Sequence, residues 1–351
     1  MEDEAVGTAR QGVRVRRVGF RFGTDPELAA MHLVESEIES ERRSGAPPQP
    51  LESYVAFARN LPSQFDDHTW LAETDDGTPV GCSACWSNGA GDPRVMECNV
   101  LVRQHWRARG VGWRLARAIL EEAQREGRSS LIWATFDAVR AGEAFSRRVG
   151  GTVARVNRIS ELRLDDLDWD TLQSWIHEGP RRAAGYRLDF WEGPFRADMA
   201  EDAVTFHHIM QTAPRDDLDV GDVVLNSRHG ASATKALVEA GRQRWTMFVR
   251  DADGYCVGGT ELTFEPWDPG VALQQDTAIH PAHRGLGLAK WAKASTVARL
   301  RDHRPTVDRI RTGNAFSNQP MLAINDALGF KVVDVRKEWQ GNTRQLRRSI
   351  H

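Results

Sequence analysis

The chain has no excess of positive charge and no long apolar run. Its 46 lysines and arginines are outnumbered by 49 aspartates and glutamates, so the formal charge is −3 and few cations are left to neutralise a string of phosphates. We therefore expect no nucleic-acid partner. The first residues are acidic where a secretory signal needs positive charge, and no segment approaches 18 consecutive apolar residues. The sequence predicts a cytoplasmic protein with no membrane partner.

Cysteine and the common nucleotide motifs are also scarce. Four cysteines in 351 residues make no disulfide framework. Cys82 and Cys85 lie in a predicted strand, where residues three apart point to opposite faces and cannot chelate one metal ion. We expect no metal. Neither GxGxxG with a later acidic residue nor GxxxxGK[ST] occurs, which argues against nicotinamide and ATP as cofactors.

An internal repeat divides the chain. At 351 residues the sequence exceeds the usual size of a single core, which predicts two domains. The segments 68–86 and 244–264 match each other, because each reads as a strand, an acidic turn ending in glycine and a second strand. An offset of 177 residues separates both the turn glycines and two later arginines: Gly77 and Gly254, then Arg107 and Arg284. A constant offset near half the length indicates a duplication.

Each copy alternates strands and helices, which predicts an α/β class with a mixed α+β sheet. In the second copy we expect a strand at 272–279, a helix at 288–301 and a helix at 320–328 that ends before Gly329. The segment 165–185 has the composition of a linker, with a short helix before Gly179-Pro180. The predicted units are an N-terminal domain at 11–165, a linker at 166–185 and a C-terminal domain at 186–351.

Two glycine-rich turns each follow an apolar strand and open an apolar-periodic helix. Glycine lets the backbone approach an anion closely, and the free N–H groups and the helix dipole favour negative charge there. The candidate ligand-binding residues are Arg107, Arg109, Gly110, Val111 and Gly112 in the first copy, and Arg284, Gly285, Leu286, Gly287, Leu288 and Ala289 in the second. Both turns are predicted phosphate sites.

The order strand, RxxGxG/A, helix, strand and helix ending in Gly-Phe resembles the GNAT superfamily of N-acyltransferases. The resemblance covers roughly residues 13–165 and 186–345, and the tandem arrangement resembles actinobacterial two-copy proteins. It implies two tandem GNAT-like domains. Each would have a mostly antiparallel central sheet that splits at the coenzyme A (CoA) site and is flanked by helices. It also implies acetyl-CoA as co-substrate, with its pyrophosphate on the glycine turns.

The resemblance implies further cofactor-binding residues. An asparagine after the closing strand usually meets the pantetheine arm, which makes Asn314 and Asn318 candidates. A backbone N–H of the strand before the glycine turn binds the acyl oxygen. The corresponding positions are Thr277, Ala278 and Ile279 in the second copy and Val100 to Val102 in the first.

Transfer to an amine requires a base, a donor for the developing oxyanion and a proton for the leaving thiolate. Asp276 is the first candidate base and Glu261 the second, while Glu97 holds a similar place in the first copy. Each of the three is alternatively a structural or substrate-anchoring carboxylate. Many GNAT members place an acidic tyrosine four residues before the helix-ending glycine, where this chain has Asn325 and Ser146. Asn325 therefore either positions the acceptor or leaves protonation to water.

The second copy is the predicted catalytic one. Its asparagine-rich segment at 312–330 is intact, whereas the first copy has Asp137 and Gly151 at the matching positions and is expected to be structural or degenerate. The predicted function is acyl transfer from acyl-CoA to the primary amine of a small molecule by direct attack, in a monomer or homodimer. Two alternatives stay open: a non-catalytic CoA-binding or regulatory protein, and a protein lysine or N-terminal acetyltransferase.

Overall fold

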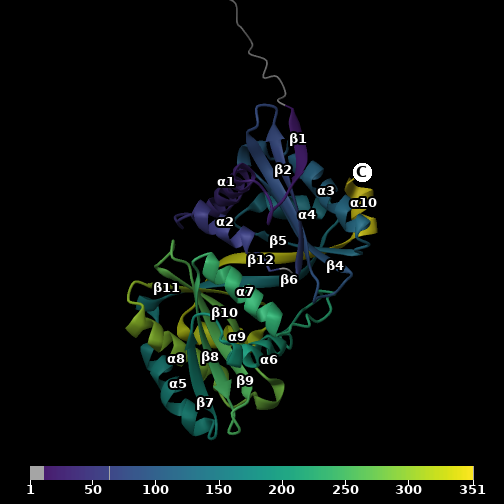
Figure 1. Ribbon diagram of the computed structural model, residues 1–351. Helices are drawn as coiled ribbons and strands as arrows, with labels where there is room; N and C mark the ends of the chain where they lie inside the picture. Colours follow the sequence, from purple (N-terminus) through teal and green to yellow (C-terminus); the bar gives the residue numbers. More distant parts are fainter. Residues whose placement is uncertain (1–11, 63, 351) are drawn as a thin grey trace, which may run out of the picture.

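One continuous mixed sheet runs through the molecule (Figure 1). The structure is a computed structural model that describes residues 12–62 and 64–350. The first half of the chain contains β1 (Val13–Val18), α1 (Asp25–Arg42), α2 (Leu51–Arg59), β2 (Phe65–Thr74), β3 (Pro79–Asn88), β4 (Val95–Val102), α3 (Val111–Arg125), β5 (Ser130–Phe136), α4 (Arg140–Arg148) and β6 (Thr152–Arg163). The second half contains α5 (Trp169–Arg182), β7 (Arg187–Glu192), α6 (Ala200–Met210), α7 (Ser227–Glu239), β8 (Gln243–Arg250), β9 (Cys256–Phe264), β10 (Val271–Ile279), α8 (Leu288–His303), β11 (Arg309–Ala315), α9 (Gln319–Leu328), β12 (Lys331–Asn342) and α10 (Thr343–Ile350).

The repeat is confirmed element by element. The two predicted hairpins are β2–β3 and β8–β9, both antiparallel. Their turn glycines, Gly77 and Gly254, have φ of 83° and 94°, a conformation that side chains other than glycine disfavour. The predicted α9 ends at Gly329 in the left-handed conformation. The mixed α/β class is therefore correct.

The two halves exchange their last strands. The strand order is β1-β2-β3-β4-β5-β12-β6-β11-β10-β9-β8-β7, so β6 pairs with β11 of the second half and β12 pairs with β5 of the first. The exchanged strands also pair with each other, antiparallel, at the middle of the sheet. The two halves thus share one hydrogen-bonded sheet, and neither half completes its own sheet.

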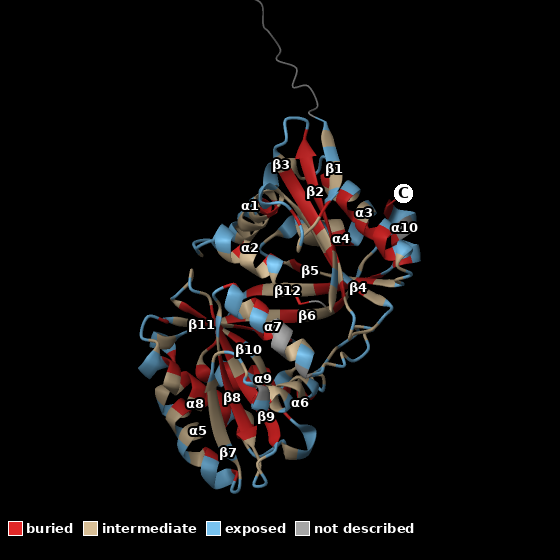
Figure 2. Cartoon of the chain, viewed as in Figure 1, coloured by how far each residue is buried: buried red, intermediate tan, exposed pale blue. Residues whose placement is uncertain are grey.

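Helices cover both faces of the sheet in each half, and the most buried residues lie on the strands between them (Figure 2). In the first half Cys82 packs with α1 residues and Cys85 with α3 residues, which confirms that these two side chains point to opposite faces. The α3 core also contains Leu346 and Ile350 of α10. The end of the chain therefore completes the first-half core.

Helix α5 occupies most of the predicted linker, and it is longer than the sequence suggested. It continues through Gly179-Pro180 to Arg182 and packs against α8. A side chain at position 179 would lie 2.3 Å from the Trp291 ring, so glycine here permits close helix packing and does not end the helix. Pro180 has no N–H to donate to the carbonyl four residues earlier, so the last turn of the helix lacks one hydrogen bond.

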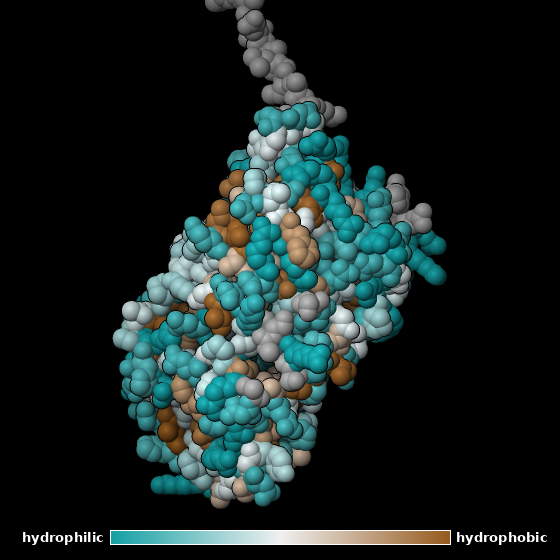
Figure 3. Space-filling model, viewed as in Figure 1, coloured by the Kyte–Doolittle hydropathy of each residue, from teal (hydrophilic) through white to brown (hydrophobic). Residues whose placement is uncertain are grey.

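Elsewhere the surface is mixed. The face in Figure 3 is mostly hydrophilic, with hydrophobic residues in small separate patches. Among the described helices, none combines the length and the apolar character needed to cross a membrane.

The exchange predicts that damage to β12 weakens the first half. Trp339 of β12 is fully buried and its indole N–H donates to Thr135 Oγ1 of β5 at 2.8 Å. We expect Trp339→Ala to lower the free energy of unfolding by about 3–5 kcal/mol in urea titrations. Amides of β5 should also exchange with solvent faster.

The control is Val333→Ala, because Val333 lies on β12 and is 49% exposed. It should change stability by less than about 0.5 kcal/mol. Unchanged exchange in β5 of Trp339→Ala would contradict the role given to β12.

Candidate functional site

The first half contains an open split between two parallel strands. Strands β4 and β5 pair only from Val95 to Glu97 and from Ser130 to Ile132. Beyond these residues β4 stays paired with β3 up to Val102, while β5 stays paired with β12 on its other edge up to Phe136. The β5-facing backbone groups after Glu97 therefore have no strand partner, and a ligand can enter there.

The first glycine turn stands at the end of β4. Gly110 has φ of 85° and caps α3, and no atom lies within 4 Å of the place where its Cβ would be. The first N–H groups of α3 lack intrahelical acceptors and face outward from the helix start. The predicted anion site is therefore accessible in the structure.

Arg107 braces this turn. Its Nε–H donates to the Val102 carbonyl at 3.0 Å and its other nitrogens hold the Glu41 carboxylate. In the second half Arg284 likewise donates to the Ile279 carbonyl, at 2.9 Å. Both guanidinium groups make hydrogen bonds to other groups of the protein. In the structure Arg107 and Arg284, two predicted CoA ligands, therefore stabilise the conformation of their turns.

A cavity of about 1080 Å³ opens from the split and the first turn. Its walls include β4 from Glu97 to Val102, the start of α3, α4 and one side of α1. It continues along the sheet into the second half, where Trp267, Leu273 and Arg311 line it. The exchanged β12 contributes Arg336 and Glu338. Both halves of the chain therefore build one cavity.

A segment of the second half also crosses to this cavity. Residues 211–226 join α6 to α7, and Leu218 and Val220 within them line the cavity. The segment is tied to the first half by hydrogen bonds from the Asp217 N–H to the Ala154 carbonyl and from the Val224 N–H to the Ala90 carbonyl. It forms part of the cavity wall.

Two of the carboxylates that line this cavity, Glu97 and Glu35, are candidate bases. Glu97 is the last residue of β4 that pairs with β5, and its exposed side chain lines the cavity. Loss of solvation beside the surrounding protein raises the pKa of Glu97, and the positive charge of Arg336 partly opposes this rise. Glu35 of α1 accepts a hydrogen bond from the Tyr54 hydroxyl at 2.7 Å, and burial raises the pKa of Glu35 to about 7. The sequence analysis did not identify Glu35, which sits in an unremarkable amphipathic helix.

The second half repeats the split with a different strand geometry. Strand β10 pairs with β11 only from Val271 to Leu273, and its pairing with β9 is interrupted between Gln274 and Thr277. Gly285 and Gly287 have φ of 86° and 79° and open α8. The predicted turn geometry thus recurs. Neither of the two cavities described, however, includes a residue of this turn.

Asp276 and Glu261, the two alternative candidate bases of the second copy, lie close enough for their charges to interact. Asp276 lies in the interrupted part of β10, and burial raises its pKa. Glu261 accepts a hydrogen bond from Thr246 Oγ1 at 2.9 Å and lies 3.7 Å from the Arg244 guanidinium. Burial raises the pKa of Glu261, and the nearby Asp276 raises it further. Their catalytic role stays a prediction.

A buried polar chain fills the interior behind the second turn. Lys293 of α8 is 1% exposed and donates to Asn325 Oδ1, and Asn325 in turn donates to Asn314 Oδ1 at 2.7 Å. Asn318 caps α9 by accepting the Met321 N–H. The three predicted asparagines are therefore engaged in structural bonds, and Asn325 lies in the buried chain with Lys293.

The two copies differ most at this place. The position of Lys293 corresponds, at the offset of 177 residues, to Ala116 in the first copy. Asn325 corresponds to Ser146, since each stands four residues before the glycine that follows its helix. Ala116 and Ser146 both line the cavity. A small residue leaves space open in the first half, and a long one occupies the equivalent space in the second.

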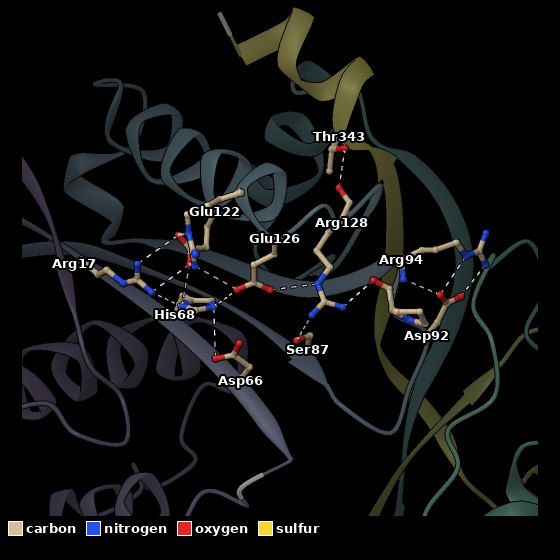
Figure 4. A network of polar contacts seen from close by, with 12 residues as sticks. Arg17, Asp66, His68, Ser87, Asp92, Arg94, Glu122, Glu126, Arg128 and Thr343 are labelled. Atoms are coloured by element: carbon tan, nitrogen blue, oxygen red, sulfur yellow. Dashed lines mark hydrogen bonds and ion pairs between the residues drawn. The ribbon is translucent and has the colours of Figure 1, made fainter.

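A separate polar network lies at the end of α3 (Figure 4). His68 is bonded to Glu126 at 2.5 Å and lies 3.6 Å from Asp66, and these three side chains have the spacing of metal ligands. Arg128 and Arg125 already pair with Glu126, at 3.3 and 3.7 Å. Because arginines compensate its charge, the network ties β2 to α3 and needs no cation.

Comparisons with known proteins agree with this geometry. Residues 32–150 match the model of the acetyltransferase (GNAT) family. No curated protein matches the sequence. Among solved structures, the chain is similar to a tandem GNAT protein from the clavulanic acid biosynthesis pathway, with 21% identity, a TM-score of 0.75 and coverage of 95% of this chain and 99% of that chain. It is also similar to a GCN5-related N-acetyltransferase from Sphaerobacter thermophilus, with 12% identity, a TM-score of 0.61 and coverage of 94% and 96%.

The buried lysine predicts a dependence of stability on pH. Burial lowers the pKa of Lys293 from 10.5 to about 7, so above pH 7 the unfolded chain binds a proton that the folded chain does not. Stability should then rise with pH between about 7 and 10, by up to about 1.4 kcal/mol per unit from this group. Lys293→Met should remove that contribution, as measured by urea unfolding at several pH values.

Lys290→Met is the matched control, because Lys290 is an exposed lysine of the same helix. Equal pH slopes in wild type and Lys293→Met would show that Lys293 is not held neutral by burial.

Proposed function

We propose that this chain, which carries a GNAT acetyltransferase domain and has the fold of a tandem GNAT protein, transfers an acyl group from acyl-CoA to a primary amine in the cavity of its first half. Acetyl-CoA is the proposed donor and a small molecule the proposed acceptor. The observation that carries the proposal is the single cavity that joins the first glycine turn to the β4–β5 split. The site of the reaction thus moves from the second copy, favoured by sequence, to the first.

The binding step follows from the turn. The pyrophosphate would lie on the free N–H groups of Gly110, Val111 and Gly112, where the helix dipole favours anions. The pantetheine arm would enter the split, since the unpaired edge of β4 offers backbone groups to an extended amide chain. The N–H groups near Val100 to Val102 are then the donors for the acyl oxygen, as the resemblance implies.

The chemical step needs one proton acceptor. The amine nitrogen attacks the thioester carbonyl carbon, the C–S bond breaks, and the products are an amide and CoA. Glu97 is the proposed base that takes the amine proton, because it faces the cavity where the strands part. Its raised pKa brings it closer to the range in which a base is effective. Glu35 is the second candidate in this half.

The leaving thiolate takes its proton from water in this proposal. Ser146, at the position of the family's acidic tyrosine, donates its hydroxyl to the Gly142 carbonyl and accepts the Trp133 indole N–H. Tyr54 lines the cavity, but its hydroxyl donates to Glu35, and burial raises the pKa of Tyr54. Neither hydroxyl is free to act as the acid.

The alternatives make different demands on the cavity. A protein acetyltransferase needs room for a peptide, whereas this cavity is walled by α1, the 211–226 segment and both halves of the sheet. A regulatory CoA-binding protein would need the turn but no base. The presence of Glu97 at the split favours catalysis, and the walls favour a small acceptor. We retain the monomer or homodimer and the cytoplasmic location as proposals.

Substitution of the turn glycines tests which half binds CoA. Gly110→Glu places a negative charge and a side chain over the anion site, so we expect CoA affinity to fall at least tenfold in isothermal titration. Gly287→Glu should leave affinity unchanged. The expected stoichiometry is one CoA per chain.

Gly127→Glu is the matched control. Gly127 also has positive φ and open space around it, but it lies past the opposite end of α3. It should carry the same backbone strain and bind CoA normally. Loss of binding only in Gly287→Glu would return the site to the second half.

Replacement of the proposed base should separate binding from turnover. Glu97→Gln should lower kcat by about 10² to 10⁴ and leave CoA affinity unchanged. In wild type kcat/KM should rise with pH as Glu97 loses its proton, with a midpoint above that of an ordinary glutamate. This rise should disappear in the variant.

Asp276→Asn is the comparison in the other copy, and it should keep wild-type turnover. A collapse of turnover in Asp276→Asn, with Glu97→Gln active, would identify the second half as catalytic. If both stay active, Glu35→Gln is the variant to measure next.

A further inference from the structure

Part of the cavity wall is lined by arginines from both halves. Arg42 and Arg43 come from the end of α1, Arg242 precedes β8, and Arg311 lies on β11. We call these four residues the arginine end. Among the described residues, Glu39 and Glu265 pair with these arginines and line the cavity, whereas their other ion-pair partners, Asp268 and Glu161, lie outside its lining. At the cavity wall itself the arginines of this group outnumber the carboxylates that pair with them.

Arg311 is the least neutralised of the four. Its one ion pair, with Glu161, has an N–O distance of 4.0 Å, and among the described residues its guanidinium makes no hydrogen bond. Arg42, by contrast, is bonded to both oxygens of Glu39, at 2.7 and 2.8 Å. Burial lowers the pKa of Arg311, and the charges of Arg43 and Arg42 lower it further, while Glu161 and Glu39 oppose this only in part. An additional anion beside Arg311 would relieve this repulsion.

Two neighbouring arginines also have unused donors. Arg43 binds Asp268 at 2.8 Å and Arg242 binds Glu265 at 3.0 Å through their terminal nitrogens. The Nε–H of each is buried without a hydrogen-bond partner among the described residues. A buried donor left unpaired is costly, so such donors usually have a partner in the working state of the protein.

We propose that the acceptor amine carries a carboxylate and that Arg311 binds it. The planar fork of a guanidinium matches two carboxylate oxygens and distinguishes a carboxylate from an uncharged group. In this arrangement the acceptor spans the cavity, with its carboxylate at the arginine end and its amine at Glu97. The proposal rests on the proposed acyl transfer in the first half and adds the acceptor class: small amino acids in which several bonds separate the amine from the free carboxylate.

The second half would then determine acceptor specificity. Arg311 and Arg242 come from the half whose own interior is filled by Lys293, and Trp267 beside them offers an apolar wall. Arg311 is a specificity-determining residue in this view, since it touches the acceptor far from the bond that is made.

The test uses matched acceptors that differ only at the carboxylate. Amino acids with a terminal amine on chains of increasing length are offered as free acids and as primary amides, with acetyl-CoA, and release of the CoA thiol is measured. We expect kcat/KM about ten- to a hundredfold higher for the acids in wild type. Arg311→Gln should abolish this preference by slowing the acids, with little effect on the amides or on CoA affinity. Arg311→Lys should restore it in part.

Arg309→Gln is the control, because Arg309 lies two residues away on the same strand and pairs with Asp308. It should keep the wild-type ratio of acid to amide. Equal rates for acids and amides in wild type, or an unchanged ratio in Arg311→Gln, would overturn the inference. So would CoA binding without acetylation of either set. Absence of CoA binding would instead overturn the proposed function.

Discussion

The pairing of β6 with β12 is the interaction on which the rest of the molecule depends. These antiparallel strands are each the last strand of one half, and each adds to the sheet of the other half. The backbone hydrogen bonds between them hold the two halves in one sheet and one register. Because of this register, β10 and β11 lie along the same surface as the β4–β5 split, and the cavity can draw on both.

Duplication followed by divergence explains the rest of the site. Both copies keep the glycine turn, the arginine that braces it and the strand split. Their interiors differ at several positions, among them Ala116 against Lys293 and Ser146 against Asn325. A buried lysine is an expensive way to fill space unless its amine is bonded, and Asn325 supplies that bond. In the structure Asn325 and Asn314 are bonded in one chain with Lys293, whereas Asn318 caps α9, and the predicted role of Asn314 and Asn318 in binding CoA stays a prediction.

The sequence predicted the local structure well and the assembly poorly. Hairpins, turns and helix ends follow from nearby residues such as Gly254 and Gly329, whose backbone conformation only glycine adopts easily. The exchange of β6 and β12 has no such local signal, because each strand would read the same if it closed its own half. The sequence-based preference for the second copy as the catalytic one stays a prediction. Lys293 bears on it, because its offset from Ala116 places a long side chain in the interior of that copy. Arg311 could not be identified from the sequence. Its proposed role depends on the finding that its guanidinium makes no hydrogen bond among the described residues.

The second copy is structurally necessary even though Lys293 fills its interior. Its strand β12 and helix α10 complete the sheet and core of the first half, and its 211–226 segment closes one side of the cavity. Deleting it would expose the edges of β5 and β6 together with the apolar face of α3, so the first half would not be expected to stand alone. The second copy contributes to the first half through β12, α10, the 211–226 segment and a few outward side chains. None of these depends on open space inside the second copy, so its interior can change. Under the proposed function, one copy binds the cofactor while the other shapes the space for the acceptor, and the shared sheet keeps the two aligned.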